Sequence, residues 1–407
     1  MKSFIPKTAV DDLAIFGGPK LYDEELHVGR PNIGSRARFY KMVDDIFERK
    51  WLSNKGAYVQ QLEARICQLT GVNHAIAVCN ATVGLEVVIR ALGLTGEVIV
   101  PSFTFVATAH SLTWLGLTPV FCDINQDTHT LDSTHLEGLI NARTSAIIPV
   151  HLWGQCCETG EIERIAEAHN LPVIYDAAHA LGTKRFGTLV GGFGAAEVFS
   201  FHATKFINSF EGGVITTNSE DLAKTIRLMI NFGFAGYDKV VSMGTNGKMN
   251  EVCAAMALTN LESFDEFVTI NRSNRDQYRR ELAGIPGISL FVESAGNTCS
   301  DQYVVGMVDS TKSGISRNHI MNIFWAENIL ARRYFYPGCH QMEPYRTQRA
   351  DNPPELPVTD LVASQVLILP TGSSVQSEDI CRICSLIRFV VENGQAISAM
   401  MSENTTN

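Results

Sequence analysis

Short apolar runs alternate with helical patterns through the first 250 residues of the chain. The apolar runs are His74–Val78, Glu97–Pro101, Pro119–Asp123, Ala146–Pro149 and Val173–Asp176, and the helical patterns lie at Val83–Leu94, from about Ala107 and at Glu161–His169. Continuously apolar strands separated by helices are typical of a mainly parallel sheet that is covered on both faces. The sequence therefore predicts an α/β fold, with ligands beyond the carboxyl ends of the strands.

The pattern changes near residue 250. A long helical stretch from Met249 to about Leu282 ends at a Gly-Ile-Pro-Gly breaker. Shorter elements follow, with a strand at Gln302–Val308 and helices at Arg317–Glu327 and Glu378–Asn393, before a polar tail from about Ser398 that we expect to fray. We predict a large α/β domain over residues 1–250, including an N-terminal arm, and a smaller α+β domain over residues 251–407.

Composition excludes several classes of protein. Of the 407 residues, 45% are hydrophobic and 19% charged, which is enough apolar surface for a sizeable core. A net charge of −10 without a basic tract argues against nucleic-acid binding, and no apolar run is long enough to span a membrane. The ten scattered cysteines predict free thiols in a reducing, cytoplasmic compartment. Cys381 and Cys384 form a single CxxC without partners, so we expect no metal.

Two ionisable residues follow predicted strands. Lys205 comes directly after the apolar run that ends at Ser200-Phe201-His202, and a lysine held among apolar neighbours can react as a free amine to form a Schiff base. Asp176 ends another strand, and a buried carboxylate needs a partner such as a pyridinium nitrogen. His179, three residues further on, could bond a phenolic oxygen. Taken singly, Lys205 could instead be a solvated loop lysine and His179 a structural histidine.

Two further segments fit a phosphorylated, planar ligand. Asn80-Ala81-Thr82 leads from a strand into a helix, and the free N–H groups of a helix N-terminus bind phosphate. Ser200 could add a hydroxyl from a neighbouring strand end. The segment Pro101–Phe105 offers an aromatic ring for stacking. Each feature alone also fits an ordinary cap or core residue, but together they supply the amine, carboxylate, ring and cradle of a pyridoxal phosphate (PLP) site.

The sequence resembles the DegT/StrS family of PLP-dependent nucleotide-sugar aminotransferases over about residues 30–390. The segments that carry the resemblance are SFHATK with EGG (200–205, 211–213), DAAHALG (176–182), PSFTFVATA (101–109), FCDI (121–124), IIPVHLWG (147–154), WLSNKG (51–56) and GTNGKMNEVCAA (244–255). The resemblance implies an aspartate-aminotransferase-like (fold-type I) large domain with a mainly parallel seven-stranded sheet.

The resemblance also implies roles for single residues. Lys205 would bond covalently to the cofactor and shuttle a proton, Asp176 would pair with the pyridine nitrogen, and His179 would contact the phenolic oxygen. Phe105 would stack on the ring, and the phosphate group would be held by Ala81, Thr82 and Ser200. Asn246 would reach the phosphate of the partner subunit's cofactor, which implies a homodimer with shared active sites.

Three positions depart from the family pattern. Ala81 stands where the family usually has Gly, which matters only if the backbone φ there is positive. Phe210 replaces a Gly before Glu211 and could narrow the mouth of the site. Lys248 stands where Arg is usual, so a bidentate contact is not expected there.

The presence of Lys205, rather than a histidine, favours transamination over sugar dehydration. By resemblance the amino donor is L-glutamate. The segment 331–345 resembles enzymes that aminate carbon 4 of dTDP-4-keto-6-deoxy-D-glucose, with Arg332, Arg333, Tyr336 and His340 as candidate substrate-binding residues. Amination at carbon 3, a GDP- or UDP-linked sugar, and a PLP-dependent dehydratase remain alternatives. The family expectation is deoxysugar synthesis for O-antigen, lipopolysaccharide or glycosylated metabolites.

Overall fold

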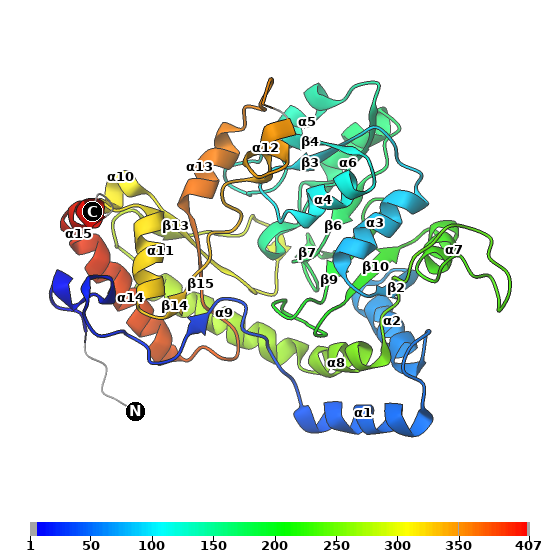
Figure 1. Ribbon diagram of the computed structural model, residues 1–407, viewed down its shortest axis with the longest axis horizontal. Helices are drawn as coiled ribbons and strands as arrows, with labels where there is room; N and C mark the ends of the chain where they lie inside the picture. Colours follow the sequence, from blue (N-terminus) through cyan, green and yellow to red (C-terminus); the bar gives the residue numbers. More distant parts are fainter. Residues whose placement is uncertain (1–5, 349, 405–407) are drawn as a thin grey trace.

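The computed structural model of the chain describes residues 6–348 and 350–404. Its centre is a mixed four-stranded sheet in the order β2-β10-β9-β6 (Figure 1). The strands are β2 (His74–Val78), β6 (Ile174–Asp176), β9 (Ala196–Ser200) and β10 (Gly213–Thr217). β9 runs parallel to β6, whereas β10 is antiparallel to both β9 and β2.

A parallel three-stranded sheet continues beside β6. Its order is β4-β3-β5, formed by β3 (Glu97–Pro101), β4 (Thr118–Cys122) and β5 (Thr144–Ile147). Two isolated parallel bridges, Ile147 with Val173 and Val150 with Asp176, link it to the central sheet. The structure therefore has two bridged sheets where one seven-stranded sheet was expected. β10 is antiparallel because a loop without a crossover helix returns the chain directly from β9.

Helices cover both faces of the central sheet, as the apolar strands predicted. Ile76 and Val78 of β2 pack in one core cluster with α3 (Ala81–Ala91) and α7 (Glu220–Met229). Their neighbours Ala75 and Ala77 point to the other face, where α1, α2 and α8 pack. Successive strand side chains point to opposite faces, so both must be apolar when both are covered. Three of these helices are α1 (Arg36–Arg49), α2 (Ala57–Thr70) and α8 (Glu251–Glu262). The other helices in the part of the chain before residue 263 are α4 (Ala107–Trp114), α5 (Ser133–Leu139) and α6 (Thr159–Ala168).

A second core is built mainly from the C-terminal third of the chain. Its antiparallel sheet has the order β11-β13-β15, formed by β11 (Ile288–Leu290), β13 (Val304–Val308) and β15 (Val366–Leu369). The helices of this part are α9 (Phe264–Glu281), α10 (Ser310–Ser313), α11 (Arg317–Ala326), α12 (Tyr345–Gln348), α13 (Pro357–Gln365), α14 (Ser377–Glu392) and α15 (Gly394–Asn404). The N-terminal segment joins this core through Leu13 and Leu26, and β1 (Leu26–His27) pairs with β14 (Ile329–Leu330). A small sheet, β12-β7-β8, is formed by β7 (Lys184–Arg185), β8 (Thr188–Leu189) and β12 (Asn297–Thr298).

Two expectations about helices need correction. The predicted helix from Met249 to Leu282 is two helices, α8 and α9, which meet at the non-helical residue Ser263. The tail expected to fray from Ser398 is helical up to Asn404 as part of α15, and residues 405–407 lie outside the described residues. Ile397 is fully buried in the second core and Met401 packs against that core, and this burial stabilises the helix.

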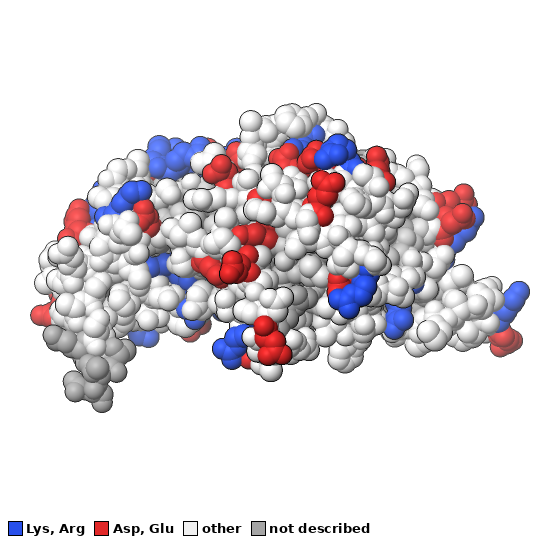
Figure 2. Space-filling view, turned by 90° about the horizontal axis from the view of Figure 1, so that it is seen from above, with Lys and Arg blue, Asp and Glu red and all other residues white. Residues whose placement is uncertain are grey.

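Surface features bear on the expected class of protein. None of the described helices is both long and apolar enough to cross a membrane. Acidic and basic side chains lie interspersed on the face that Figure 2 shows. All ten cysteines are free thiols, and the two of the CxxC lie on α14, with Cys381 exposed and Cys384 buried.

Candidate active site

The strand ends gather the predicted site residues at one edge of the central sheet. Val78 at the end of β2 pairs with Gly213, which in turn pairs with Ser200 at the end of β9. Asp176 ends β6, the parallel neighbour of β9. The loop that follows β9 carries Lys205, whose backbone N–H donates to the carbonyl of His202. This edge is where a mainly parallel sheet is expected to bind its ligand.

Lys205, Asp176 and His179 form the charged centre of the site. Burial lowers the pKa of Lys205 to about 8, against a partial opposing effect of the Asp176 charge. Burial raises the pKa of Asp176, although hydrogen bonds from Thr108 and from the Ala178 N–H favour its ionised form. Burial and the Lys205 charge hold the pKa of His179 well below its usual range, so its ring is neutral at pH 7. The site thus holds a reactive amine and a buried carboxylate that a further cation would stabilise.

His179 lies in a box of aromatic rings. Its ring stacks on Trp153 and on Phe335, each 6.2 Å away between centroids, and Tyr303 packs against it at 4.9 Å. The Tyr303 hydroxyl is 3.4 Å from His179 Nε2. His179 Nδ1 is buried and has no hydrogen-bond partner among the described residues. A buried ring nitrogen without a partner is costly, so this atom is suited to a polar group of a bound ligand.

Backbone N–H groups at the start of α3 form an anion cradle. Asn80 caps the helix by accepting a hydrogen bond from the Val83 N–H at 2.8 Å, and Ala81 and Thr82 form its first turn. Gly213 lies against this turn, where an added Cβ would come within 2.9 Å of the Ala81 nitrogen. Ala81 is itself helical, so replacing the family's Gly causes no strain at this position.

Phe105 is 59% exposed, which leaves a large ring face free beside the strand ends. Its ring centroid is 6.5 Å from that of Phe335, which also stacks on His179. Phe105 and His179 thus both lie beside Phe335, and stacking of Phe105 on a planar ligand stays a prediction. Phe335 lies in the segment 331–345, which carries the candidate substrate-binding residues. It therefore connects these residues with the candidate cofactor-binding residues Phe105 and His179.

The candidate substrate-binding residues have unequal surroundings. The Arg333 guanidinium lies over the Tyr336 ring, 4.3 Å from its centroid, and donates to Asn318, while Arg332 is exposed. Neither arginine forms a salt bridge within the part of the chain that the structure describes. His340 is engaged differently: its Nδ1 is 2.7 Å from the Ser102 hydroxyl, and its Nε2 lies 3.2 Å from Asp360.

Asn246, Lys248 and Phe210 are at least partly accessible to solvent. Asn246 is exposed and pairs through its backbone with Asn231, next to Gly247, whose carbonyl accepts from the Cys79 N–H. Lys248 donates to the Asn231 side chain at 2.8 Å. Phe210 has a positive φ of 64° and packs edge-on against Phe39.

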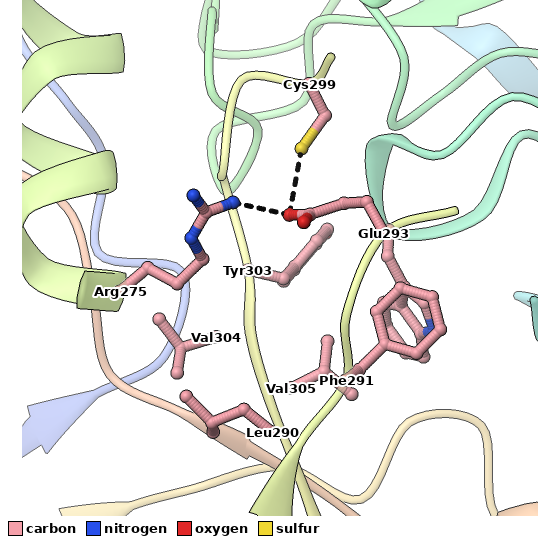
Figure 3. Close-up of a pocket in the computed structure, with 9 residues that line it drawn as sticks. Arg275, Leu290, Phe291, Glu293, Cys299, Tyr303, Val304 and Val305 are labelled. Carbon is pink, nitrogen blue, oxygen red and sulfur yellow. Dashed lines mark hydrogen bonds and ion pairs between the residues drawn. The ribbon is translucent and has the colours of Figure 1, made fainter. Parts of the chain in front are cut away.

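A polar cluster adjoins the aromatic box (Figure 3). Glu293, Cys299 and Asp301 bring their ligand-type atoms within 4.8 Å of one another. Figure 3 shows Glu293 between Cys299 and Arg275. The Arg275 guanidinium forms ion pairs with the carboxylates of Glu293 and Asp301. Arg275 therefore supplies positive charge that balances these two carboxylates. This cluster anchors the chain directly before Gln302, whose side chain donates to the His179 carbonyl and accepts from the Phe206 N–H. It therefore supports the loops on both sides of the site.

The sequence reasoning missed several residues that the fold brings to the site. These are Thr108, Trp153, Gln302, Tyr303 and Phe335. Thr108 and Trp153 lie within segments already singled out, so their positions after strands could have identified them. Gln302 and Tyr303 directly precede β13 of the second core, and no local pattern indicates that they reach His179.

The whole chain is similar to known sugar aminotransferases. Residues 35–388 match the DegT/DnrJ/EryC1/StrS aminotransferase family. The chain is 35% identical over 368 residues to a dTDP-4-amino-4,6-dideoxy-D-glucose transaminase of Escherichia coli, covering 90% of this chain and 98% of that protein. It is 33% identical over 372 residues to a GDP-perosamine synthase of Caulobacter vibrioides, covering 90% and 98%.

Solved structures agree with the fold. The DesI protein, determined in the presence of its TDP-sugar product, superposes with a TM-score of 0.93 and is 45% identical in sequence. The match covers 97% of this chain and 100% of the DesI chain. The similarity therefore extends over both cores and the loops between them.

Proposed function

Because the chain belongs to the DegT/DnrJ/EryC1/StrS aminotransferase family, we propose that it aminates carbon 4 of dTDP-4-keto-6-deoxy-D-glucose, with L-glutamate as amino donor. The product would be dTDP-4-amino-4,6-dideoxy-D-glucose, the sugar in the name of the E. coli relative. The observation that carries the reaction class is Lys205, an amine of lowered pKa beside Asp176 and His179. Deoxysugar synthesis for O-antigen or lipopolysaccharide is the corresponding biological role.

Aminotransferases of this family depend on PLP, and the residues present fit that cofactor. The unpartnered His179 Nδ1 and the buried Asp176 carboxylate are suited to bind the polar atoms of the PLP ring. Gly213 has no side chain that would crowd the Ala81 nitrogen, so a phosphate can approach this N–H group. When bound, PLP supplies an electron sink for the carbon that gains or loses the amine.

This chain's own residues would then bind, orient and move protons. Ala81, Thr82 and Ser200 would hold the phosphate, and Phe105 would cover one face of the ring. Asp176 would keep the ring nitrogen protonated, because a carboxylate favours a neighbouring cation. Lys205, with a pKa of about 8, would both donate and accept a proton at its Nζ near neutral pH.

Arg332 and Arg333 supply positive charge for the pyrophosphate of the nucleotide sugar. Arg333 is held by Tyr336 and Asn318, so its orientation is fixed before the substrate binds. His340 bonds Ser102 at the end of β3, and we assign it to holding the segment 331–340 in place beside the substrate.

The exposed apolar residues support a homodimer. They gather along α1, the turn after it and the loop before α8: Tyr40, Phe47, Trp51, Leu52, Phe232, Tyr237, Val240, Val241 and Met243. Large exposed apolar patches mark protein–protein contacts, so exposed apolar side chains on these segments support a partner there. Asn246 lies in the same loop, so in the dimer it would reach the phosphate of the partner's PLP. We also infer two units, with the division moved from residue 250 to Ser263 because α8 packs on the central sheet, and with Leu13 and Leu26 placing the N-terminal arm on the smaller unit.

The free thiols support a reducing compartment, and we infer a cytoplasmic enzyme. A GDP-linked substrate is the second candidate, because the GDP-perosamine synthase covers as much of the chain as the E. coli relative does. Amination at carbon 3 and sugar dehydration fit no specific contact in this site.

A substrate panel tests the proposal. The purified protein, PLP and L-glutamate are incubated with dTDP-, UDP- and GDP-linked 4-keto and 3-keto sugars, and products are identified by mass and NMR. We expect the highest kcat/KM for the dTDP-linked 4-keto sugar. A preference for a GDP-linked sugar would select the second candidate, and a deoxygenated product without an amine would exclude transamination.

A further inference from the structure

The Asp176 carboxylate is held by two hydrogen bonds. It is 6% exposed at the end of β6, where its Oδ1 accepts from the Ala178 N–H at 3.1 Å. Its Oδ2 accepts from the Thr108 hydroxyl at 2.8 Å. Both partners favour the ionised form of a carboxylate that burial would otherwise neutralise. Of these two donors, only the Thr108 hydroxyl belongs to a side chain, so it can be removed by substitution without altering the backbone.

Thr108 is in turn bonded to Thr104. Both threonines are buried, one in the segment after β3 and the other in the first turn of α4, and their hydroxyl oxygens are 3.1 Å apart. An ionised carboxylate can only accept, so the single Thr108 proton must go to Asp176. The Thr104 hydroxyl is therefore the donor to Thr108. The direction of the chain is fixed: Thr104 donates to Thr108, which donates to Asp176.

A chain of hydrogen bonds with one direction strengthens its last bond, most of all in a site shielded from water. Its end point is the group to which we assign the cofactor nitrogen. We propose that Thr108, oriented by Thr104, is a positioning residue that holds the Asp176 carboxylate ionised and turned toward the ring nitrogen of PLP. This inference rests on the proposed role of Asp176.

The test separates positioning from a purely structural role. Thr108→Val keeps the shape and removes the hydroxyl, Thr108→Ser keeps the hydroxyl, and Thr70→Val removes a buried threonine hydroxyl that bonds only a helix carbonyl in α2. Dissociation constants are measured for PLP and for 1-deazapyridoxal phosphate, which has carbon in place of the ring nitrogen. If Thr108 acts on the contact between Asp176 and the ring nitrogen, its loss must raise the dissociation constant of PLP and leave that of the carbon analogue unchanged.

We expect Thr108→Val to weaken PLP binding by about 10- to 100-fold, the range for a hydrogen bond to a charged group, and to leave binding of the carbon analogue unchanged. Thr108→Ser and Thr70→Val should bind PLP like the wild type. Thr104→Val should show the same selectivity with a smaller loss, and it serves if Thr108→Val does not fold.

Two results would overturn the inference: unchanged PLP binding by Thr108→Val, or an equal loss for PLP and its carbon analogue. A wild-type protein that binds the two compounds equally would instead show that Asp176 does not pair with the ring nitrogen. That result would contradict the proposed site itself, so the two failures can be told apart.

Discussion

Lys205 owes its chemistry to its surroundings rather than to its position in a motif. Burial favours the neutral amine, while the Asp176 charge favours the ammonium form, and the balance leaves its pKa at about 8. A lysine with an ordinary pKa of 10.5 would be almost wholly protonated near neutral pH and unreactive. The structure therefore predicts a measurable pH dependence for the reaction of this one side chain.

We expect the rate at which PLP attaches to the cofactor-free protein to rise with pH and level off above about 8. The sign follows because only the neutral amine is a nucleophile, and deprotonation increases with pH. The rate is followed by the growth of the absorbance of lysine-bound PLP at about 410–430 nm. Asp176→Asn should shift the midpoint to lower pH, because it removes the charge that stabilises the ammonium form. A midpoint near 10.5, as for a solvated lysine, would contradict this description.

Among the helices, α3 carries in its first turn the phosphate cradle that we propose. Its N–H groups are fixed by the Asn80 cap, and Thr82 adds a side-chain hydroxyl at the same place. A helix N-terminus favours an anion even without a basic residue. This is how a chain with a net charge of −10 can hold a phosphate group.

Thr82→Val should weaken PLP binding by about 10-fold or more, because it removes one hydrogen bond to a charged group. The backbone N–H groups remain, so binding should not be lost. Thr82→Ser restores the hydroxyl and serves as the control, and fluorescence titration of the cofactor-free proteins measures all three affinities. Equal affinities for the wild type and Thr82→Val would remove Thr82 from the cradle.

The sequence predicted elements well where a pattern is local. The strands at His74–Val78 and Glu97–Pro101 have the predicted bounds, because a fully buried strand shows its apolar run directly. The extent of α15 could not be predicted, since it depends on where Ile397 packs in the second core. The same holds for the site: Lys205 follows one strand and Asp176 ends another, but Thr108 reaches Asp176 only because the first turn of α4, after β3, lies beside the end of β6.

In the whole molecule, Asn246 adjoins the end of β2 through its neighbour Gly247, whose carbonyl accepts a hydrogen bond from the Cys79 N–H. It lies in a loop with exposed apolar residues such as Tyr237 and Met243. An apolar loop that carries a polar residue proposed to bind phosphate suggests a site completed by a second copy. In a symmetric dimer each chain would supply Lys205 to one site and Asn246 to the other.

Mixing two inactive variants tests this arrangement. Lys205→Ala removes the amine, and Asn246→Asp places a negative charge against the phosphate. If the sites are shared, half of the randomly mixed dimers carry one intact site, and the mixture should recover about a quarter of wild-type activity. The variants are unfolded together, refolded and assayed with glutamate and the keto sugar. No recovery, from a mixture that light scattering shows to be dimeric, would place Asn246 outside the shared site.

We propose that Lys205, Asp176 and His179 serve the transfer of an amino group to a nucleotide-linked keto sugar. Nitrogen-15-labelled L-glutamate and dTDP-4-keto-6-deoxy-D-glucose, incubated with the PLP-loaded protein, test it most directly. We expect a dTDP-amino sugar that carries the label at carbon 4, and no product with Lys205→Ala. An unlabelled sugar product, or the same labelled product from Lys205→Ala, would contradict it.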